Sequence, residues 1–199
     1  KEPPKMRTQM DSVYEFVFRG LLTEKALDGA GRKARNDHSE SDSDVAATLS
    51  VDLLDDDLVA EAKRMAAVYT AVAAFENTVR DLVRETLTEE FEEKWWADGV
   101  SDKIRQRAES RRDEEQKNRW HTPRGAEPIN YTELGDLVNT IRRNEDLFTP
   151  FIPSADWAKS VFDVIERSRN VIMHSGTLSK PDIERLGINI RDWIKQVGT

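Results

Sequence analysis

Residues 58–91 read LVAEAKRMAAVYTAVAAFENTVRDLVRETLTEEF, and this stretch decides the fold of the chain. Its apolar residues recur at alternating steps of four and three, which predicts one long helix that packs along a single face. These residues are Leu58, Ala62, Met65, Tyr69, Val72, Val79 and Val83. The same spacing places Glu76 on the packing face. A carboxylate there is costly unless it is paired or opens onto a wet cleft, so Glu76 indicates either such a position or a small error in the register.

The rest of the chain predicts further helices, because alternating strand patterns are absent. Helices are expected over 101–120, 131–143 and 155–175. Ser154 is the expected N-cap of the third helix and Gly176 its end. Ser179 and Pro181 begin a last helix. Its expected packing residues are Ile183, Leu186, Ile190, Ile194 and Val197. The predicted fold class is all-α, a helical bundle with long antiparallel helices and an additional N-terminal amphipathic helix.

Composition limits the kind of protein. The chain has 199 residues, 38% of them hydrophobic, which is enough for one compact domain with a core. It has no cysteine, which excludes disulfides, thiolate nucleophiles and thiolate metal sites. No apolar run approaches the roughly 18 residues of a membrane span, and no signal-peptide pattern opens the chain. We therefore expect a soluble cytoplasmic protein without membrane contact, and the first residue, Lys1, suggests a piece of a longer one.

Three segments are expected along the chain. Residues 1–30 form an N-terminal helical segment, with apolar residues at helical spacing from Met10 to Leu22. Residues 31–48 have no apolar periodicity and are expected to be an acidic and polar linker. Residues 49–199 are expected to be the main helical domain.

The net charge of −8 is concentrated in one place. Eight acidic residues and no lysine or arginine lie between Asn36 and Asp57, so the remainder of the chain sums to zero. Acidity therefore does not exclude an anionic ligand elsewhere. The expected helix over 101–120 alternates basic and acidic residues, which is typical of a solvated helix with i,i+4 ion pairs rather than a nucleic-acid-binding stripe.

An arginine, an asparagine and a histidine interrupt the apolar pattern near the end of the helix expected over 155–175. On an ideal helix, Asp163, Arg167, Asn170 and His174 form one polar row. Arg169 falls in a different, apolar row, where a guanidinium requires a carboxylate. Glu76 is the matching anomaly on the other long helix, so the two residues are expected to pair.

These side chains can cleave RNA without a metal ion. Histidine moves protons near neutral pH, and arginine stabilises charge on a phosphate while the ribose 2′-OH attacks it. No histidine or carboxylate cluster has metal-ligand spacing, and we expect no cofactor. The alternative interpretation is structural, because a histidine in the last turn of a helix also interacts favourably with the carbonyl dipoles.

The sequence Arg169-Asn170-Val-Ile-Met-His174 resembles the Arg-Asn-x-x-x-His signature of the HEPN superfamily. The similarity extends from about Leu49 to the C-terminus and includes four further groups of residues. These are Tyr69 with Phe75-Glu76-Asn77-Thr78-Val79-Arg80, Trp95-Trp96, Ile129-Asn-Tyr131, and Ser175-Gly176 after the signature. The resemblance implies a helical bundle and, in many members, a metal-independent endoribonuclease of toxin–antitoxin, phage-defence or RNA-processing systems. It implies that Arg169, Asn170 and His174 are catalytic and that Glu76 supports them. Arg80, Arg167 and Ser175 are expected to contact the substrate.

The resemblance also implies a homodimer through the motif helix. Arg169 and His174 differ by about 140° around an ideal helix, so one protomer cannot easily direct both at one phosphate. A twofold axis beside this helix would bring a second copy of each into the same cleft. The expected partners are RNA, a second copy of the chain, and an antitoxin or an upstream domain. Two other functions stay open: a non-catalytic RNA-binding, nucleotide-binding or dimerisation domain, and a helical regulatory extension of a larger enzyme.

Overall fold

The computed structural model describes residues 42–198, and the chain divides into two units, Lys1–Leu54 and Asp55–Thr199. The described part of the first unit consists of α2 (Asp42–Thr48) and the 3₁₀ helix η1 (Val51–Leu53). The amphipathic helix expected over 10–22 lies outside the described residues.

The boundaries of the expected linker differ from the structure. Residues 31–48 were expected to be irregular throughout, but α2 occupies the last seven of them. Asp42 and Asp44 lie in its first turn, where carboxylates favour helix formation because they interact with the helix dipole. The second unit begins at Asp55 rather than at residue 49.

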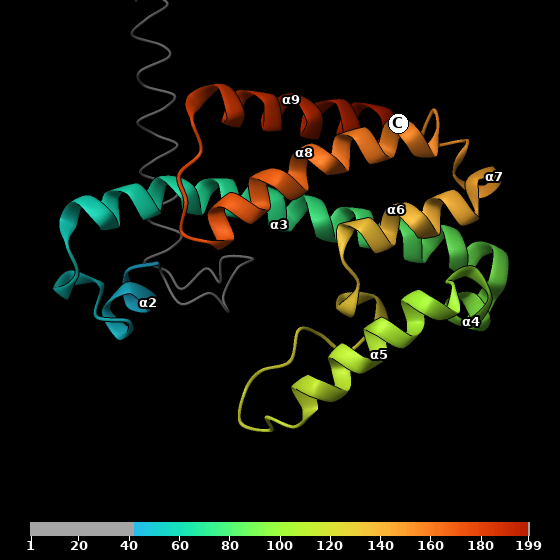
Figure 1. The fold of residues 1–199 in the computed structure, drawn as a ribbon, viewed down its shortest axis with the longest axis horizontal. Coiled ribbons are helices and arrows are strands. Elements are labelled where there is room, and N and C mark those ends of the chain that lie inside the picture. Colours follow the sequence, from blue (N-terminus) through green and yellow to red (C-terminus); the bar gives the residue numbers. More distant parts are fainter. Residues whose placement is uncertain (1–41, 199) are drawn as a thin grey trace, which may run out of the picture. The chain divides into compact units, whose positions relative to one another are not determined.

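The second unit is all-α over its described residues, as predicted (Figure 1). The long helix α3 (Asp56–Phe91) has 36 residues and begins at Asp55, whose side chain accepts hydrogen bonds from the backbone N–H groups of Asp57 and Leu58. The other elements follow in the order η2 (Glu92–Lys94), α4 (Trp95–Gly99), α5 (Asp102–Gln116), η3 (Pro128–Tyr131), α6 (Leu134–Arg143), α7 (Glu145–Phe148), α8 (Ala155–Met173) and α9 (Lys180–Val197).

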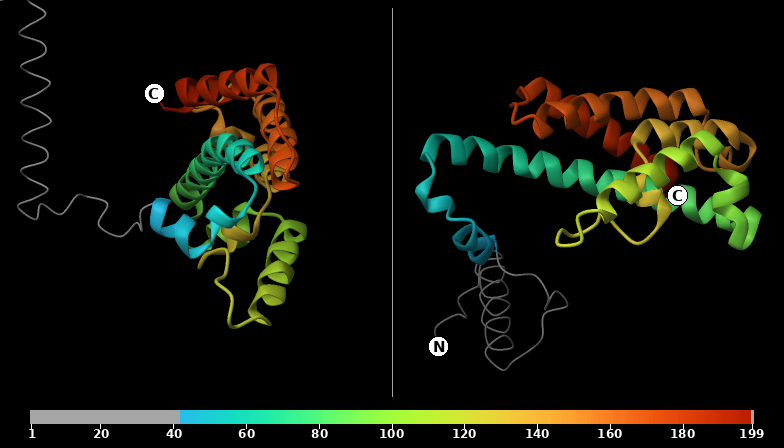
Figure 2. Two further views of the ribbon diagram at one scale, coloured as in Figure 1. Left: turned by 90° about the vertical axis from the view of Figure 1, so that its left-hand side faces the viewer. Right: turned by 60° about the horizontal axis from the view of Figure 1, so that its bottom comes forward.

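Four helices, α3, α6, α8 and α9, form the main packed group of this unit. Helices α6 and α8 both contact α3, and α9 folds back along α8 after a short connection (Figures 1 and 2). Helix α5 lies against η3, which leads into α6. The helix predicted over 131–143 begins three residues later, at Leu134, because Tyr131 belongs to the 3₁₀ turn Pro128–Tyr131, and it ends at Arg143 as predicted. Ser154 and Ser179 cap α8 and α9 as predicted.

The packing face of α3 agrees with the prediction only in part. Met65, Val72, Val79 and Val83 are buried, and so is Glu76. Leu58, Ala62 and Tyr69 are exposed, however, whereas Val68 and Phe75 are buried in the neighbouring row. A helix with 3.6 residues per turn drifts away from a strict seven-residue pattern, so one row cannot stay buried along all of α3.

Aromatic side chains fill the core between α3, α8 and α9. Phe75 lies edge-on to both Phe162 and Trp193, with ring centroids 5.7 Å apart in each pair. Trp157 stacks on Trp193 at 5.5 Å with an angle of 6° between the ring planes. The expected packing residue Ile194 is instead 57% exposed, because the adjacent Trp193 points into this cluster.

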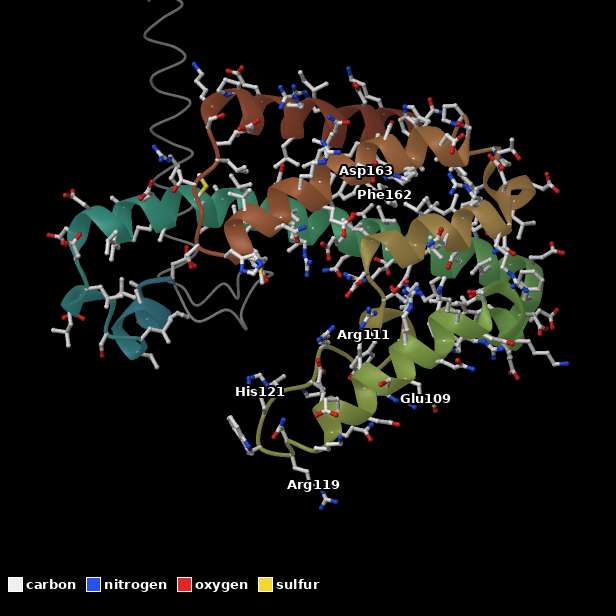
Figure 3. All side chains as sticks on the ribbon, viewed as in Figure 1. Glu109, Arg111, Arg119, His121, Phe162 and Asp163 are labelled. Atoms are coloured by element: carbon white, nitrogen blue, oxygen red, sulfur yellow. The ribbon has the colours of Figure 1, made fainter. Side chains whose placement is uncertain are left out.

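The charged helix α5 is less solvated than predicted. Its ion pairs at helical spacing are i,i+3 pairs such as Arg105–Asp102. Arg107 and Arg111 reach instead across to Asp136 in the first turn of α6, and this carboxylate is 3% exposed. Arg111 also donates to the carbonyl oxygen of Tyr131 at 2.7 Å. Figure 3 shows Arg111 on the side of α5 that faces η3. These contacts attach α5 to the start of α6.

The turn after α8 differs from the expected glycine cap. His174 is the C-cap, and Ser175, not Gly176, has the left-handed backbone, with φ of 58°. Ser175 N donates to Ile172 O at 3.1 Å and Gly176 N donates to Val171 O at 2.8 Å, which is a Schellman motif. Gly176 is needed for close approach, because a Cβ there would lie 2.9 Å from Val171 O.

We predict opposite effects on stability from substitutions at this turn. Ser175→Gly removes the strain of a left-handed L-residue and should stabilise the domain by about 0.5–1 kcal/mol. Gly176→Ala forces a Cβ against a backbone carbonyl and should destabilise it by about 1–3 kcal/mol. Urea denaturation followed by circular dichroism measures both. Gly135→Ala is the control, since a Cβ there meets nothing within 4 Å. Equal stabilities of the Gly176 and Gly135 variants would contradict the close-approach argument.

Candidate functional site

Glu76 lies near the middle of α3 and is paired with two arginines, as its place in the sequence predicts. The residue is 8% exposed. Its Oε2 accepts a hydrogen bond from Arg80 Nη2 at 3.1 Å, and its Oε1 lies 2.9 Å from Arg169 Nε. The Nε–H of Arg169 does not point at Oε1, which accepts no hydrogen bond from the described residues, so this second contact is purely electrostatic. The pairing compensates for burial of the carboxylate.

Arg80 connects α3 to the segment before α6. Besides Glu76, it donates to Asn77 Oδ1 at 3.0 Å and to the backbone carbonyl of Thr132 at 3.3 Å. Its side chain is 15% exposed. Arg80 therefore pairs with Glu76 and also links α3 to the segment before α6.

Arg169 is more accessible, with a side chain that is 41% exposed. It contacts Glu76 through Nε, and its Nη groups make no hydrogen bond within the described part of the chain. The contact with Glu76 involves only the Nε side of the guanidinium and leaves both Nη groups unengaged by described residues. Those donors are available to an anion.

A polar pocket of about 280 Å³ surrounds these groups, and we call it the Glu76 pocket. Its walls come from α3, from the 117–127 loop, from η3 with the start of α6, and from α8. The lining residues are Glu76, Arg80, Arg124, Asn130, Thr132, Glu133, Leu134, Glu166, Arg169 and Asn170. The structure therefore brings together four of the seven residues predicted for the site, namely Glu76, Arg80, Arg169 and Asn170.

Six lining residues were not among the predicted site residues: Arg124, Asn130, Thr132, Glu133, Leu134 and Glu166. Arg124 and Asn130 belong to segments whose distance from α8 in sequence hides their proximity in the fold. Glu166 could have been predicted from the sequence. It lies three residues before Arg169 and four before Asn170, and therefore on the same side of an α-helix. The carboxylate of Glu166 and the amide of Asn170 make no hydrogen bond or ion pair with other described residues.

The other predicted site residues do not line the Glu76 pocket. His174 is exposed at the C-cap of α8, and its side chain has no polar partner among residues 42–198. Arg167 lines a different hollow beside Asp182 and Arg185 of α9. Ser175 lines an apolar pocket of about 520 Å³ between α3 and the turn after α8. One protomer therefore separates Arg169 from His174, as their helical angle predicts.

The polar row expected on α8 is not one functional unit. Asp163, labelled in Figure 3, pairs with Lys159 at 2.6 Å and so forms an ordinary i,i+4 surface pair. His121, in the 117–127 loop, lies at its outer tip next to Trp120 (Figure 3). Within the described residues, no group of three or more histidines, aspartates and glutamates could hold a metal ion. None of the described helices has the length and apolar character to cross a membrane.

Comparisons with protein-family models, with curated proteins and with solved structures found no match for this chain.

We predict unequal contributions from the two arginines that pair with Glu76. Arg80→Met removes the more buried partner and the donor to Thr132, and should lower the free energy of unfolding by on the order of 3 kcal/mol. Arg169→Met removes a half-exposed partner and leaves Glu76 paired with Arg80, so the loss should be about 1 kcal/mol. Urea denaturation gives both values, with the exposed Arg64→Met of α3 as the control. Equal losses at Arg80 and Arg169 would show that burial does not determine how much each pair contributes to the free energy of unfolding.

Proposed function

We propose that residues 55–198 form a metal-independent endoribonuclease domain of HEPN type, which acts as a homodimer within a cytoplasmic defence, toxin or RNA-processing protein. One observation carries the proposal: Arg169 and Asn170, the first two residues of the motif, line a polar pocket together with Glu76 and Arg80. A bundle helix needs neither an arginine nor an asparagine at these positions for packing.

In this proposal, Arg169 binds the scissile phosphate through its free Nη groups. Glu76 fixes the guanidinium at 2.9 Å from its carboxylate, which removes much of the side-chain motion that binding would otherwise have to restrict. Arg80 shares the negative charge of Glu76, so Glu76 does not fully neutralise the positive charge of Arg169. Asn170 donates its amide N–H to a phosphate oxygen. Such preorganised donors act on the negative charge that develops as the phosphate becomes five-coordinate.

His174 supplies the proton transfers. As a base it takes the proton of the ribose 2′-OH, and the 2′ oxygen attacks the phosphorus. The bond from phosphorus to the 5′ oxygen then breaks, and that oxygen takes a proton from the imidazolium or from water. The products carry 2′,3′-cyclic phosphate and 5′-hydroxyl ends. This reaction requires neither electron transfer nor a metal ion.

A second copy of the chain completes the site in this proposal. His174 lies outside the Glu76 pocket, so the histidine that serves Arg169 comes from the other protomer. The end of α8 also presents apolar side chains that a partner can cover: Val171 is 38% exposed and Met173 is 54% exposed. Tyr69 of α3, 53% exposed, belongs to the adjacent apolar pocket.

A second candidate function is RNA or nucleotide binding without cleavage. The separation of His174 from the Glu76 pocket favours it, because a binding domain needs the pocket but not a proton-transfer group. Cleavage assays separate the two functions, and binding measurements alone do not.

We expect the purified chain to cleave single-stranded RNA in the presence of EDTA. His174→Ala should lower the rate by roughly 10²–10⁴, the usual contribution of general acid–base catalysis. Arg169→Ala should lower it by about 10²–10³ or more through lost charge stabilisation. Initial rates on a labelled oligonucleotide and mass analysis of the ends test this, after melting curves show that both variants are folded. Cleavage of DNA, of RNA with a 2′-O-methyl group at the scissile position, or of RNA only with added Mg²⁺ would exclude the mechanism.

A mixing experiment tests the composite site. Arg169→Ala and His174→Ala dimers should each be inactive, but a heterodimer has one site with both residues intact. After random subunit exchange, half of the dimers are heterodimers with one of two sites restored, so about a quarter of the wild-type activity should return. Light scattering at micromolar concentration should show a dimer. A fully active monomer, or a mixture that remains inactive despite exchange, would contradict this arrangement.

A further inference from the structure

Glu166 is a partly buried carboxylate with no polar partner among residues 42–198, and it lines a pocket that also holds three arginines. Arg80 and Arg169 are paired with Glu76, and Glu133 pairs with Arg111 at 2.8 Å. Glu166 makes neither a hydrogen bond nor an ion pair with any described residue, although it lines the Glu76 pocket. A site built for phosphate alone would not contain an unpaired carboxylate, because it repels the anion.

Arg124 contributes a second unused group to the same pocket. It is anchored from the 117–127 loop by Glu115 of α5, which contacts Arg124 Nε and accepts from the Arg124 backbone N–H at 3.2 Å. The Nη groups of Arg124 make no hydrogen bond within the described residues. The pocket thus offers an acceptor-only group from α8 and a donor-only group from the loop.

Among the four RNA bases, guanine fits this combination. It carries two adjacent donors, N1–H and the N2 amino group, which match the two oxygens of one carboxylate. Its O6 and N7 are acceptors that an arginine binds with two parallel hydrogen bonds. Adenine and cytosine place a donor beside an acceptor, and uracil has a single N–H between two carbonyls, so each would leave the Glu166 carboxylate partly unsatisfied. Unpaired bases in single-stranded RNA are read along these edges.

We infer that the Glu76 pocket binds a guanine base of the substrate, with Glu166 accepting from N1–H and N2–H and Arg124 donating to O6 and N7. The inference rests on the proposed function for the presence of RNA, and it makes Glu166 and Arg124 residues that determine specificity. The volume of about 280 Å³ lies just below the range of small-molecule sites, about 300–1,000 Å³, which suits one base rather than a whole oligonucleotide. The phosphate next to that base would lie at Arg169, at the α8 side of the pocket.

Isothermal titration of the 199-residue chain with single nucleotides tests this assignment. 5′-GMP should bind about tenfold or more tightly than AMP, CMP or UMP, since a matched pair of hydrogen bonds discriminates by roughly that factor. Inosine monophosphate lacks the N2 amino group and should bind about tenfold more weakly than GMP. Glu166→Gln replaces an acceptor by a donor at almost unchanged volume, and it should remove the preference for GMP.

Glu89→Gln is the matched control, because Glu89 is an exposed helical glutamate of α3 outside the pocket, and this variant should keep the preference. Arg124→Met should weaken GMP binding and leave UMP binding unchanged. Equal affinities for the four nucleotides, or a GMP preference that survives Glu166→Gln, would overturn the inference. RNA cleavage without guanine preference contradicts this inference alone, whereas GMP preference without any cleavage contradicts the proposed nuclease and retains the pocket.

Discussion

One buried carboxylate determines how this domain can be arranged. A carboxylate buried in the packing face of α3 is costly without cations, and Arg80 one turn later on α3 and Arg169 on α8 supply them. Arg80 then reaches the carbonyl of Thr132, which fixes the approach to α6. A single desolvated charge therefore sets the relation of three segments that are far apart in sequence.

The two sides of α3 at this position have different environments. Phe75, next to Glu76, faces the aromatic cluster of Phe162 and Trp193. Glu76 itself faces the polar pocket. The aromatic side belongs to the hydrophobic core, and the polar side has groups that hydrogen bonds within the described residues do not satisfy. In the function that we propose, catalysis takes place on the polar side, where these groups can bind the substrate.

Much of the helical architecture is readable from the sequence because it depends on local rules. Ser154 and Ser179 cap α8 and α9 where a side-chain oxygen can accept from the first turn. The pairing of Glu76 with Arg169 was also predictable, since each residue is anomalous in its own helix. The exposure of Leu58 and Tyr69 was not predicted, because a strict seven-residue pattern was extended along a helix that drifts away from it.

The candidate site was predictable only along the helices that carry it. Helical spacing predicted the pairing of Glu76 with Arg169, and the family resemblance added Asn170 and Arg80 to the site. All four line one pocket. Arg124 reaches this pocket from a loop, and arginines of α5 pair with the buried Asp136 of α6. Neither arrangement could be predicted, because each brings together residues that are far apart in sequence. His174 was grouped with Arg169 by the Arg-Asn-x-x-x-His signature, but it is the C-cap of α8 and does not line the Glu76 pocket.

The unequal burial of the ion pairs has a consequence for ionic strength. Mobile ions screen the exposed pairs of α5, such as Lys117–Glu114 with side chains 68% and 72% exposed, over about 10 Å at 0.1 M salt. They have little access to Glu76 and Arg80, whose side chains are 10% and 15% exposed. High salt should therefore weaken the exposed pairs of α5 first and leave the pair of Glu76 with Arg80 largely unaffected. The contact of Arg169 with Glu76 should respond to salt to an intermediate degree, because the Arg169 side chain is 41% exposed.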